Sequence, residues 1–421
     1  MKQIVIIADD LTGACDTGVK FRQQGLKTKV LVSPNSADIL NTSPVPVVSI
    51  NTDTRSAGVE AAAEVVEKLT EQLRYQGDYF YYKKVDSVLR GNICGELEAM
   101  FRVLKPDFAL VAPAFPATGR WLKDGVLSIG NKEKPQLQID ALERISFSTQ
   151  RRCGHIHLET VRQGTDAVIR QAEALYKEGC TILLADTWCE VDLETLADVV
   201  LRLGSRCLPV GSAGLATHLA GRLAENNAEE ADGPTPDQTE GALVVVVGSR
   251  HPVTVEQVQN LKKAVSMETY LLDVAGISQE NLHSRVESAF REKRSGAADS
   301  ILLTTDYIYN SSDNCQHLLQ QNAYNQSILD GIGVCVEKLA KKTPIRGMIA
   351  TGGDIASEIL GHLKLEQIDL MEEPIPGIVT GYAADSSGKG FRLATKSGGF
   401  GDPDALLELY KYMQRSQYEK E

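Results

Sequence analysis

The stretch Ile4–Gly18, IVIIADDLTGACDTG, decides the fold. A run of β-branched residues predicts a buried strand, which stops abruptly at two adjacent carboxylates, Asp9 and Asp10, and then turns at Gly13. In open α/β sheets, ligands bind at the carboxyl ends of the strands. The stretch therefore predicts acidic side chains at a binding edge. A solvated turn in which Asp10 caps the next helix explains the same residues equally well.

Length, charge and cysteine spacing indicate a two-domain globular protein. The chain has 421 residues, which is long for a single core. Its net charge of −12 argues against a basic face for nucleic acid, although local lysines can still form an anion pocket. No apolar run reaches the roughly 20 residues that span a bilayer. The eight cysteines are scattered and include no Cys-x-x-Cys pair. We therefore expect a cytoplasmic protein without a nucleic-acid or membrane partner.

Short apolar runs alternate with helical patterns along the first half of the chain. Strands separated by helices form βαβ units, so we expect an α/β fold with a mostly parallel sheet flanked by helices. The predicted strands are 3–8, 28–32, 45–50, 79–84, 108–113, 181–186 and one near 207–211. The predicted helices include 57–75, 94–104, 159–178 and 191–203.

A polar, acidic segment with two prolines separates this half from a second α/β lobe. We predict domains at 1–224 and 242–421, joined by a linker at 225–241. The second domain begins with the apolar run Leu243–Val247. It continues with strands at 269–274, 300–304 and 346–350 and helices at 279–292, 323–341 and 354–363. A cleft between two such lobes is the default position for an active site.

Charged side chains follow three predicted strands of the first domain. Asp9 ends the first strand, Arg55 follows the third, and the fourth runs into Lys83, Lys84 and Asp86. Arg55 and one of the two lysines suit a carboxylate, the arginine through two hydrogen bonds and the lysine as a point charge. The two aspartates suit hydroxyl groups, as hydrogen-bond or proton acceptors. This edge fits a small polyhydroxylated acid. The plainer interpretation is that the double lysine is an exposed strand end.

Three glycine loops mark the second half of the chain. They read GSRHPVT at 248–254, TGGDIA at 351–356 and KSGGFGDP at 396–403. A glycine turn that enters a helix presents free N–H groups and the positive end of the helix dipole to an anion. Each loop alone is weak support, but three in one lobe predict a phosphate site. The chain contains no G-x-x-x-x-G-K-[ST] or G-x-G-x-x-G, so a P-loop NTPase or a standard dinucleotide fold is not expected.

Four segments, in their order and spacing, resemble those of the four-carbon acid sugar kinases. They are ADDLTG at 8–13, KKVDSVLRGN at 83–92, TGGD at 351–354 and KSGGFG at 396–401. The resemblance covers essentially the whole chain and implies a sugar-acid-binding N-terminal lobe and a nucleotide-binding C-terminal lobe. It also implies ATP-dependent phosphorylation of the terminal hydroxyl of a four-carbon sugar acid. D-threonate is the favoured acid, and D-erythronate or 3-oxo-tetronate are the alternatives.

The same resemblance implies roles for individual residues. Those matched to sugar-acid binding are Asp9, Arg55, Lys83, Lys84, Val85 and Asp86. Those matched to nucleotide binding are Ser249, Gly352, Gly353, Asp354 and Gly398. One departure concerns Ile355, which stands where many relatives carry a threonine after Gly-Gly-Asp. A contact made by that hydroxyl in relatives must be made differently here.

Phosphoryl transfer needs positioning and charge neutralisation more than covalent chemistry from the protein. We expect Mg²⁺ to be held mostly by water and phosphate oxygens, and we assign no residue as a metal ligand. The catalytic candidates are Asp354, beside the glycine pair, and Asp86, with Asp9 a further rival for the base. The segment Cys153–His157 has alternating Cys and His residues that could bind zinc, but no second cluster completes the set.

Two other classes of protein remain as alternatives. An oxidoreductase acting on small hydroxy acids would need a dinucleotide fingerprint or a catalytic metal cluster, and the sequence shows neither. A non-catalytic sugar-acid sensor would have no use for three phosphate-type loops. A homodimer is expected only because isologous dimers are common.

Overall fold

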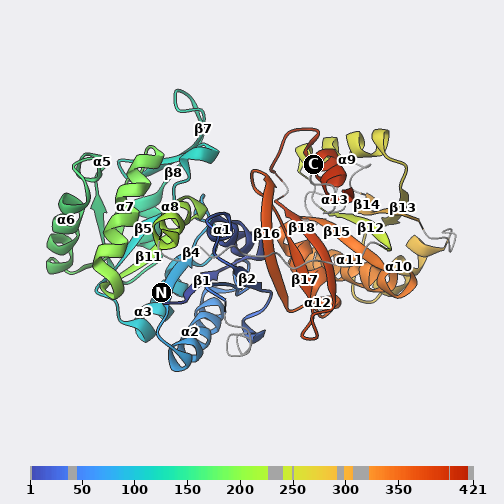
Figure 1. Cartoon of the computed structure of the whole chain (residues 1–421), viewed down its shortest axis with the longest axis horizontal. Coiled ribbons are helices and arrows are strands. Elements are labelled where there is room, and N and C mark those ends of the chain that lie inside the picture. The colour runs from blue at the N-terminus through green and yellow to red at the C-terminus, as the bar shows by residue number, and fades with distance from the viewer. Residues whose placement is uncertain are drawn as a thin grey trace. The chain divides into compact units, whose positions relative to one another are not determined.

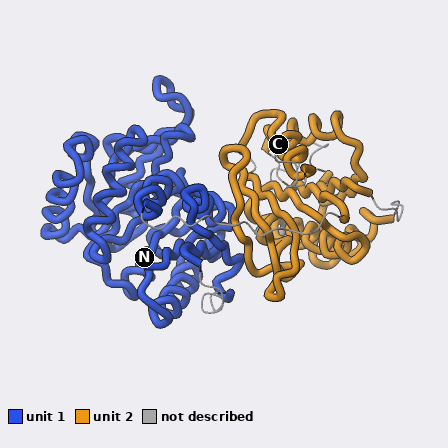
Figure 2. Tube along the Cα trace, in the orientation of Figure 1, with its two compact units in different colours: residues 1–232 blue, residues 233–421 orange. Residues whose placement is uncertain are grey.

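The computed structural model describes residues 2–36, 45–225, 240–248, 251–291, 298–306, 322–397 and 399–415. The chain divides into two compact units, Met1–Asp232 and Gly233–Glu421, which Figure 2 shows in blue and orange. Most of the linker predicted at 225–241 lies outside the described residues. Each unit is described separately below.

A parallel sheet forms the centre of unit 1. Its strand order is β2-β3-β1-β4-β11-β5-β10-β9, and every neighbouring pair is parallel. The strands are β1 (Ile4–Ala8), β2 (Thr28–Leu31), β3 (Val47–Asn51), β4 (Phe80–Lys84), β5 (Phe108–Ala112), β9 (Arg152–Ile156), β10 (Cys180–Ala185) and β11 (Cys207–Gly211). Because the strands are parallel, their carboxyl ends lie along one edge.

Helices cover both faces of this sheet, as Figure 1 shows. One apolar cluster joins the sheet to α2 (Val59–Gln76), α3 (Ile93–Leu104) and α4 (Ala141–Phe147). Another joins the opposite face to α1 (Leu11–Gln23), α5 (Leu158–Val161), α6 (Thr165–Lys177), α7 (Glu190–Leu203) and α8 (Ala213–Ala224). Burial on both faces explains why the strands are continuous apolar runs rather than alternating patterns.

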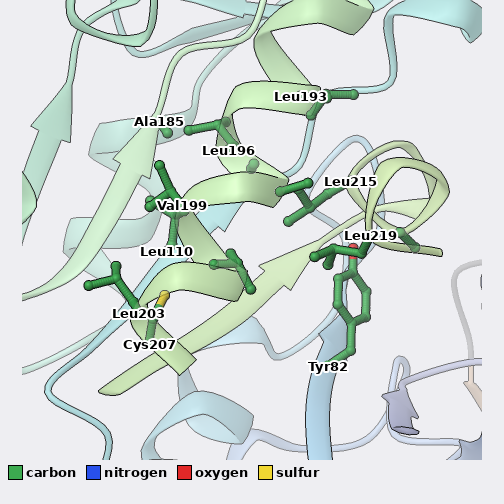
Figure 3. Close-up of a cluster of buried hydrophobic side chains, with 14 of the residues drawn as sticks. Tyr82, Leu110, Ala185, Leu193, Leu196, Val199, Leu203, Cys207, Leu215 and Leu219 are labelled. Atoms are coloured by element: carbon green, nitrogen blue, oxygen red, sulfur yellow. The ribbon is translucent and has the colours of Figure 1, made fainter. Parts of the chain in front are cut away.

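Alternation along β4 places neighbouring residues on opposite faces of the sheet. Tyr81 packs against the apolar cluster that includes α2 and α3. Tyr82 is fully buried in the cluster on the opposite face, which includes α7 and α8, and lies next to Leu215 and Leu219 in Figure 3. The Tyr82 hydroxyl donates a hydrogen bond to the carbonyl of Ser212 (2.5 Å). The buried phenol therefore keeps a polar partner, as its position requires.

A small antiparallel sheet is inserted after β5. It has the order β6-β7-β8, with β6 (Arg120–Lys123), β7 (Val126–Gly130) and β8 (Pro135–Asp140). A backbone bridge between Leu122 and Thr187 joins it to the segment after β10. Nothing in the alternating βαβ pattern predicted this insertion.

Unit 2 has a mixed sheet with the order β13-β14-β12-β15-β18-β17-β16. The first five strands are parallel and the last two pairings are antiparallel. The strands are β12 (Ala242–Val247), β13 (Glu268–Leu272), β14 (Ser300–Thr305), β15 (Ile345–Thr351), β16 (Gln367–Ile375), β17 (Ile378–Ala384) and β18 (Gly390–Lys396). The helices are α9 (Pro252–Ala264), α10 (Leu282–Phe290), α11 (Asn322–Lys342), α12 (Gly353–His362) and α13 (Ala405–Gln414). An apolar cluster joins α9 and α13 to one face of the sheet.

The predicted fold class, a mostly parallel sheet flanked by helices in each lobe, is confirmed. The single helix predicted at 159–178 is wrong, because the structure breaks it into α5 and α6. Gly164 caps α6 with φ of 96°, a conformation that favours glycine. The strands β16, β17 and β18 were all missed, since they follow one another without an intervening helix.

Two further expectations concern the environment of the chain. No disulfide joins any of the cysteines that the structure describes. None of the helices within the described ranges has the length and apolar character to cross a bilayer. A cytoplasmic location and a homodimer stay predictions.

Leu110 tests the packing of unit 1, because it is fully buried in β5 within the cluster of Figure 3. We expect Leu110→Ala to lower the free energy of unfolding by about 3 kcal/mol, through lost burial and the remaining cavity. Urea denaturation followed by circular dichroism measures the change. The matched control is Leu137→Ala in β8, where the side chain is 51% exposed. A loss for the control equal to that of Leu110→Ala would contradict this packing.

Candidate functional site

The carboxyl end of β1 carries two buried carboxylates, Asp9 and Asp10. Asp10 is the N-cap of α1, and its Oδ1 accepts a hydrogen bond from the backbone N–H of Gly13 (3.0 Å). The capping interpretation is therefore correct for Asp10. Asp10 has a second contact, because its carboxylate also forms an ion pair with Arg55.

Arg55 binds both carboxylates at once. Its Nε and Nη2 donate to Asp9 Oδ2 and Oδ1 (3.0 and 2.8 Å), and its Nη2 and Nη1 lie 2.7 Å from Asp10 Oδ1 and Oδ2. The guanidinium side chain is only 19% exposed. Most of its N–H groups are thus used by the protein's own carboxylates. In this structure Arg55 orients Asp9 and Asp10, and its binding of the acid stays a prediction.

This arrangement separates the pKa values of the two aspartates. Burial raises the pKa of Asp9, but the charge and hydrogen bonds of Arg55 outweigh it, so the pKa lies below its ordinary value. Burial dominates at Asp10 and raises its pKa, against the opposing charges of Arg55 and Lys84. Two neighbouring carboxylates with different pKa values are typical of functional sites.

Lys83 and Lys84 have different surroundings because β4 points them to opposite faces. Lys83 is fully buried, and its Nζ lies 2.6 Å from Glu96 Oε2 while donating to the carbonyls of Ile7 (3.2 Å) and Lys84 (3.0 Å). Lys84 lies on the α1 face, where a Cβ added at Gly13 would stand 2.8 Å from its Nζ. The Nζ of Lys84 forms no hydrogen bond or ion pair with the residues that the structure describes. Lys84 is therefore the lysine able to receive an anion.

Asp86 stands beside this group on the loop after β4. Arg90 binds it through two hydrogen bonds, Nε to Oδ2 (3.0 Å) and Nη2 to Oδ1 (2.7 Å). Although burial raises the pKa of Asp86, these hydrogen bonds hold it well below its ordinary value. Arg55 Nη2 lies 4.0 Å from Asp86 Oδ1, so Asp86 extends the Asp9–Arg55 cluster. The preceding residue, Val85, is buried, and its N–H donates to the carbonyl of Gly211.

Two arginines at this edge were not assigned from the sequence. Arg90 is 61% exposed along its side chain and was quoted only as part of the segment 83–92. Arg120 lies on β6, and burial lowers its pKa while the charges of Asp86 and Asp16 act to raise it. The ion pair of Arg90 with a residue four positions away offered a signal. Arg120 offered none, because its strand was not predicted.

The segment Cys153–His157 gains a third potential metal ligand in the fold. The ligand atoms of His155, His157 and Asp186 lie within 4.8 Å of one another. However, the two oxygens of Asp186 already take hydrogen bonds from three backbone N–H groups and from His155 Nε2 (2.8 Å). This carboxylate holds the turn between β6 and β7 in place. The arrangement favours a structural His–Asp pair over a metal site.

In unit 2, the glycine loops converge at the carboxyl ends of β12, β15 and β18. The N–H of Gly352 donates to the carbonyl of Lys396 (2.8 Å), which joins the second loop to the third. A Cβ added at Gly399 would lie 3.4 Å from His251 Nε2, which places the third loop beside the first. Gly352 has φ of 109° and precedes Gly353, the first residue of α12. Ser249 and Gly398 lie outside the described residues.

Ile355, which stands where many relatives carry a threonine, packs beneath the first glycine loop. The residue is buried, and a Cβ added at Gly248 would meet its Cδ1 at 2.5 Å. The isoleucine therefore fills the space beneath the first loop with apolar atoms. Its neighbour Asp354 is exposed in the first turn of α12, and its carboxylate forms no hydrogen bond within the described part of the chain.

Lys396 is the buried cation at this edge. Its side chain ends β18, and its Nζ donates to the carbonyl of Ser397 (3.1 Å). Burial lowers the pKa of Lys396 to about 8. A desolvated ammonium beside a helix N-terminus suits an anion. Lys396 lies in the third glycine motif, but the sequence alone predicted no role for it.

Family comparisons support the same division of the chain. The Sugar-binding N-terminal domain matches residues 4–219, and the Nucleotide-binding C-terminal domain matches residues 244–406. A D-threonate kinase from Bordetella bronchiseptica is 28% identical, covering 99% of each chain. The chain belongs to the four-carbon acid sugar kinase family. It is therefore an ATP-dependent sugar-acid kinase, as predicted from the sequence, and not a sensor or an oxidoreductase.

Other members of this kinase family differ in the acid that their names give. A D-erythronate kinase from Heliobacterium modesticaldum is 26% identical and covers 98% of each chain. A 3-oxo-tetronate kinase from Pseudomonas fluorescens is also 26% identical, over 94% of each chain. A solved structure from Salmonella typhimurium LT2, described as a putative tRNA synthase, is 24% identical. It covers 98% of this chain and 100% of its own, and its TM-score of 0.77 shows that the fold is shared.

Lys396 provides a test of the nucleotide site. We expect Lys396→Met to weaken ATP binding about tenfold, which is the loss of one charge-assisted contact. Phosphate favours the charged lysine, so ATP affinity of the unaltered protein should fall as the pH rises above about 8. The variant should lose this decline. Calorimetric titration with ATP across this pH range measures both effects.

The matched control is Lys389→Met, at the exposed turn before β18. It removes one lysine charge from the same hairpin and should keep the affinity and the pH dependence of the unaltered protein. An unchanged pH profile in Lys396→Met would contradict a phosphate-binding role.

Proposed function

We propose that this kinase transfers the γ-phosphoryl group of ATP to the 4-hydroxyl of D-threonate, with Mg²⁺. The observation that carries the proposal is the cluster of Asp9, Asp10, Arg55, Lys84 and Asp86 at the strand ends of unit 1. It combines carboxylates fixed by an internal guanidinium with one lysine that no described residue binds. A small molecule with both hydroxyl groups and a carboxylate complements this combination.

In the proposed complex, Lys84 and Arg90 receive the carboxylate of the acid. Lys84 supplies a buried point charge, and Arg90 supplies exposed N–H groups beside Asp86. Asp9 and Asp10 accept hydrogen bonds from the hydroxyl groups of the acid. Arg55 keeps both carboxylates in place and does not need to leave them. The division of roles differs from the sequence prediction, in which Arg55 itself clamps the acid.

The comparisons with named relatives support D-threonate as the acid. The segments that define the family match as a set. Relatives named D-threonate kinase are 26 to 29% identical to this chain, against 25 to 26% for those named D-erythronate kinase or 3-oxo-tetronate kinase. The acids differ at one or two carbons. Discrimination between them depends on which hydroxyl finds a partner in the pocket, since an unpaired buried polar group costs far more than a lost contact.

The glycine loops of unit 2 are proposed to hold the nucleotide. Gly352 and Gly353 let backbone N–H groups approach the phosphates, and Lys396 neutralises part of their charge. Ser249 and Gly398 complete the predicted set. Mg²⁺ prefers oxygen ligands and keeps several waters, so water and phosphate oxygens would supply most of its ligands. When bound with ATP, the ion would neutralise phosphate charge.

Asp354 is also the proposed base for the reacting hydroxyl. Its carboxylate is exposed at the start of α12, beside the glycine pair. Asp86 is the weaker candidate, because Arg90 occupies both of its oxygens and keeps it ionised with a low pKa. A carboxylate so stabilised accepts a proton poorly.

A panel of four-carbon acids tests the proposed substrate. The panel holds D- and L-threonate, D- and L-erythronate, 3-oxo-tetronate and 2-oxo-tetronate, each with ATP and Mg²⁺ in an assay coupled to ADP formation. We expect D-threonate to give the highest kcat/KM, by about tenfold or more over its epimer, because one misplaced hydroxyl leaves buried carboxylates unpaired. Phosphorus NMR of the product locates the phosphate on the 4-hydroxyl.

If another acid of the panel gives the highest kcat/KM, that acid replaces D-threonate as the proposed substrate, and the protein is still a sugar-acid kinase. Absence of turnover with every acid, despite ATP binding, would contradict the proposed acceptor.

Asp354→Asn tests the proposed base. The amide keeps the size of the side chain and cannot take the proton, so we expect kcat to fall about a hundredfold while the KM for ATP changes little. Steady-state kinetics with both substrates separates the two parameters. The control is Asp385→Asn, in the exposed turn between β17 and β18. If Asp354→Asn keeps the kcat of the unaltered protein, a group other than Asp354 accepts the proton of the reacting hydroxyl.

A further inference from the structure

A buried ion pair, Lys83 with Glu96, forms no hydrogen bond or ion pair with Asp9, Asp10 or Arg55, although the charge of Lys83 helps to lower the pKa of Asp9. Lys83 Nζ lies 2.6 Å from Glu96 Oε2, and the two side chains are 0% and 1% exposed. Lys83 also donates to the carbonyls of Ile7 and Lys84, so three acceptors surround its ammonium. Neither side chain reaches solvent. The pair cannot meet a substrate without rearrangement of the core.

Glu96 also connects the ion pair to the loop that follows β3. Its second oxygen, Oε1, accepts a hydrogen bond from Thr54 Oγ1 (2.6 Å). The Thr54 hydroxyl lies 2.7 Å from that of Thr52, which is itself 3.0 Å from the carbonyl oxygen of Ala8. One polar network thus connects α3, β4, the loop 52–55 and the end of β1.

Stability alone does not account for this pair. Removing two charges from water costs several kcal/mol per ion, and apolar residues of similar size are often as stable in the same position. The pair therefore calls for a function other than added stability. Its position indicates one, because the network includes Thr54, the residue directly before Arg55.

We propose that Glu96, held by Lys83, is a positioning residue that fixes the loop 52–55 and so sets the orientation of Arg55. The proposal rests on the proposed function, in which Arg55 orients the carboxylates that bind the sugar acid. The backbone N–H groups of Thr54 and Arg55 both donate to the carbonyl of Asp9 (3.0 and 3.1 Å). A shift of Thr54 therefore moves Arg55 and Asp9 together.

The hydrogen bonds of this network fix the orientation of the groups they join, whereas apolar packing does not. Glu96 has one oxygen for Lys83 and one for Thr54, so the hydroxyl of Thr54 can meet it in only one orientation. Asn92 supports the same loop from α3, donating from Nδ2 to the carbonyl of Thr54 (2.9 Å). With the loop held from two sides, Arg55 can keep its bidentate contact with Asp9 when no substrate is present.

Substitution of Thr54 tests this role with little risk to the fold. Thr54→Val keeps the shape of the side chain and removes its hydroxyl, whereas Thr54→Ser keeps the hydroxyl. We expect the valine variant to raise the KM for D-threonate about tenfold, the cost of one charge-assisted hydrogen bond, with the KM for ATP within about twofold. The serine variant should restore most of the affinity. Thermal melts of each variant confirm that it is folded.

A double variant removes the charged pair itself. Lys83→Met with Glu96→Met leaves no unpaired charge, so the protein should stay folded while the KM for D-threonate rises as in Thr54→Val. Tyr82→Phe is the matched control, since it removes a buried hydrogen bond at the neighbouring position of β4, on the opposite face. It should alter the melting temperature without altering either KM.

Three outcomes overturn the inference. They are an unchanged KM for D-threonate in Thr54→Val or in the double variant, an equal rise of this KM in Thr54→Val and Thr54→Ser, and an equal rise of this KM in the Tyr82→Phe control. D-threonate binding by Asp9→Asn shows whether the inference alone or the proposed function as well is wrong. If Asp9→Asn loses D-threonate binding while Thr54→Val does not, only the inference is wrong. If Asp9→Asn also keeps its affinity, the proposed sugar-acid site itself is wrong.

Discussion

The contact of Arg55 with Asp9 and Asp10 is the interaction on which the first site depends. Two carboxylates buried side by side at the end of a strand repel each other and lose their hydration. The Arg55 guanidinium outweighs these costs at Asp9 and offsets part of them at Asp10, where burial still raises the pKa. The parallel sheet makes the contact possible, because β1 and β3 are neighbours and their carboxyl ends meet at one edge. Asp86 and Lys84 then join the same edge through β4, which pairs with β1 on its other side.

Sequence reasoning found the fold class because buried parallel strands are continuous apolar runs separated by helices. The same reasoning failed where that alternation stops, at the inserted sheet β6–β8 and at the consecutive strands β16, β17 and β18. Strands joined by a hairpin have no helix between them, so the sequence pattern does not distinguish them from a loop. Arg120 was missed for this reason, since it belongs to β6.

Side-chain partners were harder to predict than positions. The alternation of β4 could have separated Lys83 from Lys84, since adjacent residues of a strand face opposite ways. Nothing in the sequence shows that Glu96, on the following helix, would pair with Lys83, or that Arg55 would bind the protein's own carboxylates. The convergence of the three glycine loops follows from the strand order of unit 2, in which β15 lies between β12 and β18. Spacing along the chain carries no information about that order.

The central claim is that the cluster around Asp9 binds the sugar acid, with Lys84 on its carboxylate. A crystal structure of the protein with D-threonate tests it most directly. The account predicts the carboxylate of the acid at Lys84 Nζ, hydroxyl groups at Asp9 and Asp10, and Arg55 still bound to both aspartates. An acid bound away from β1 and β4, or one that draws Arg55 out of its contact with Asp9, would contradict the account.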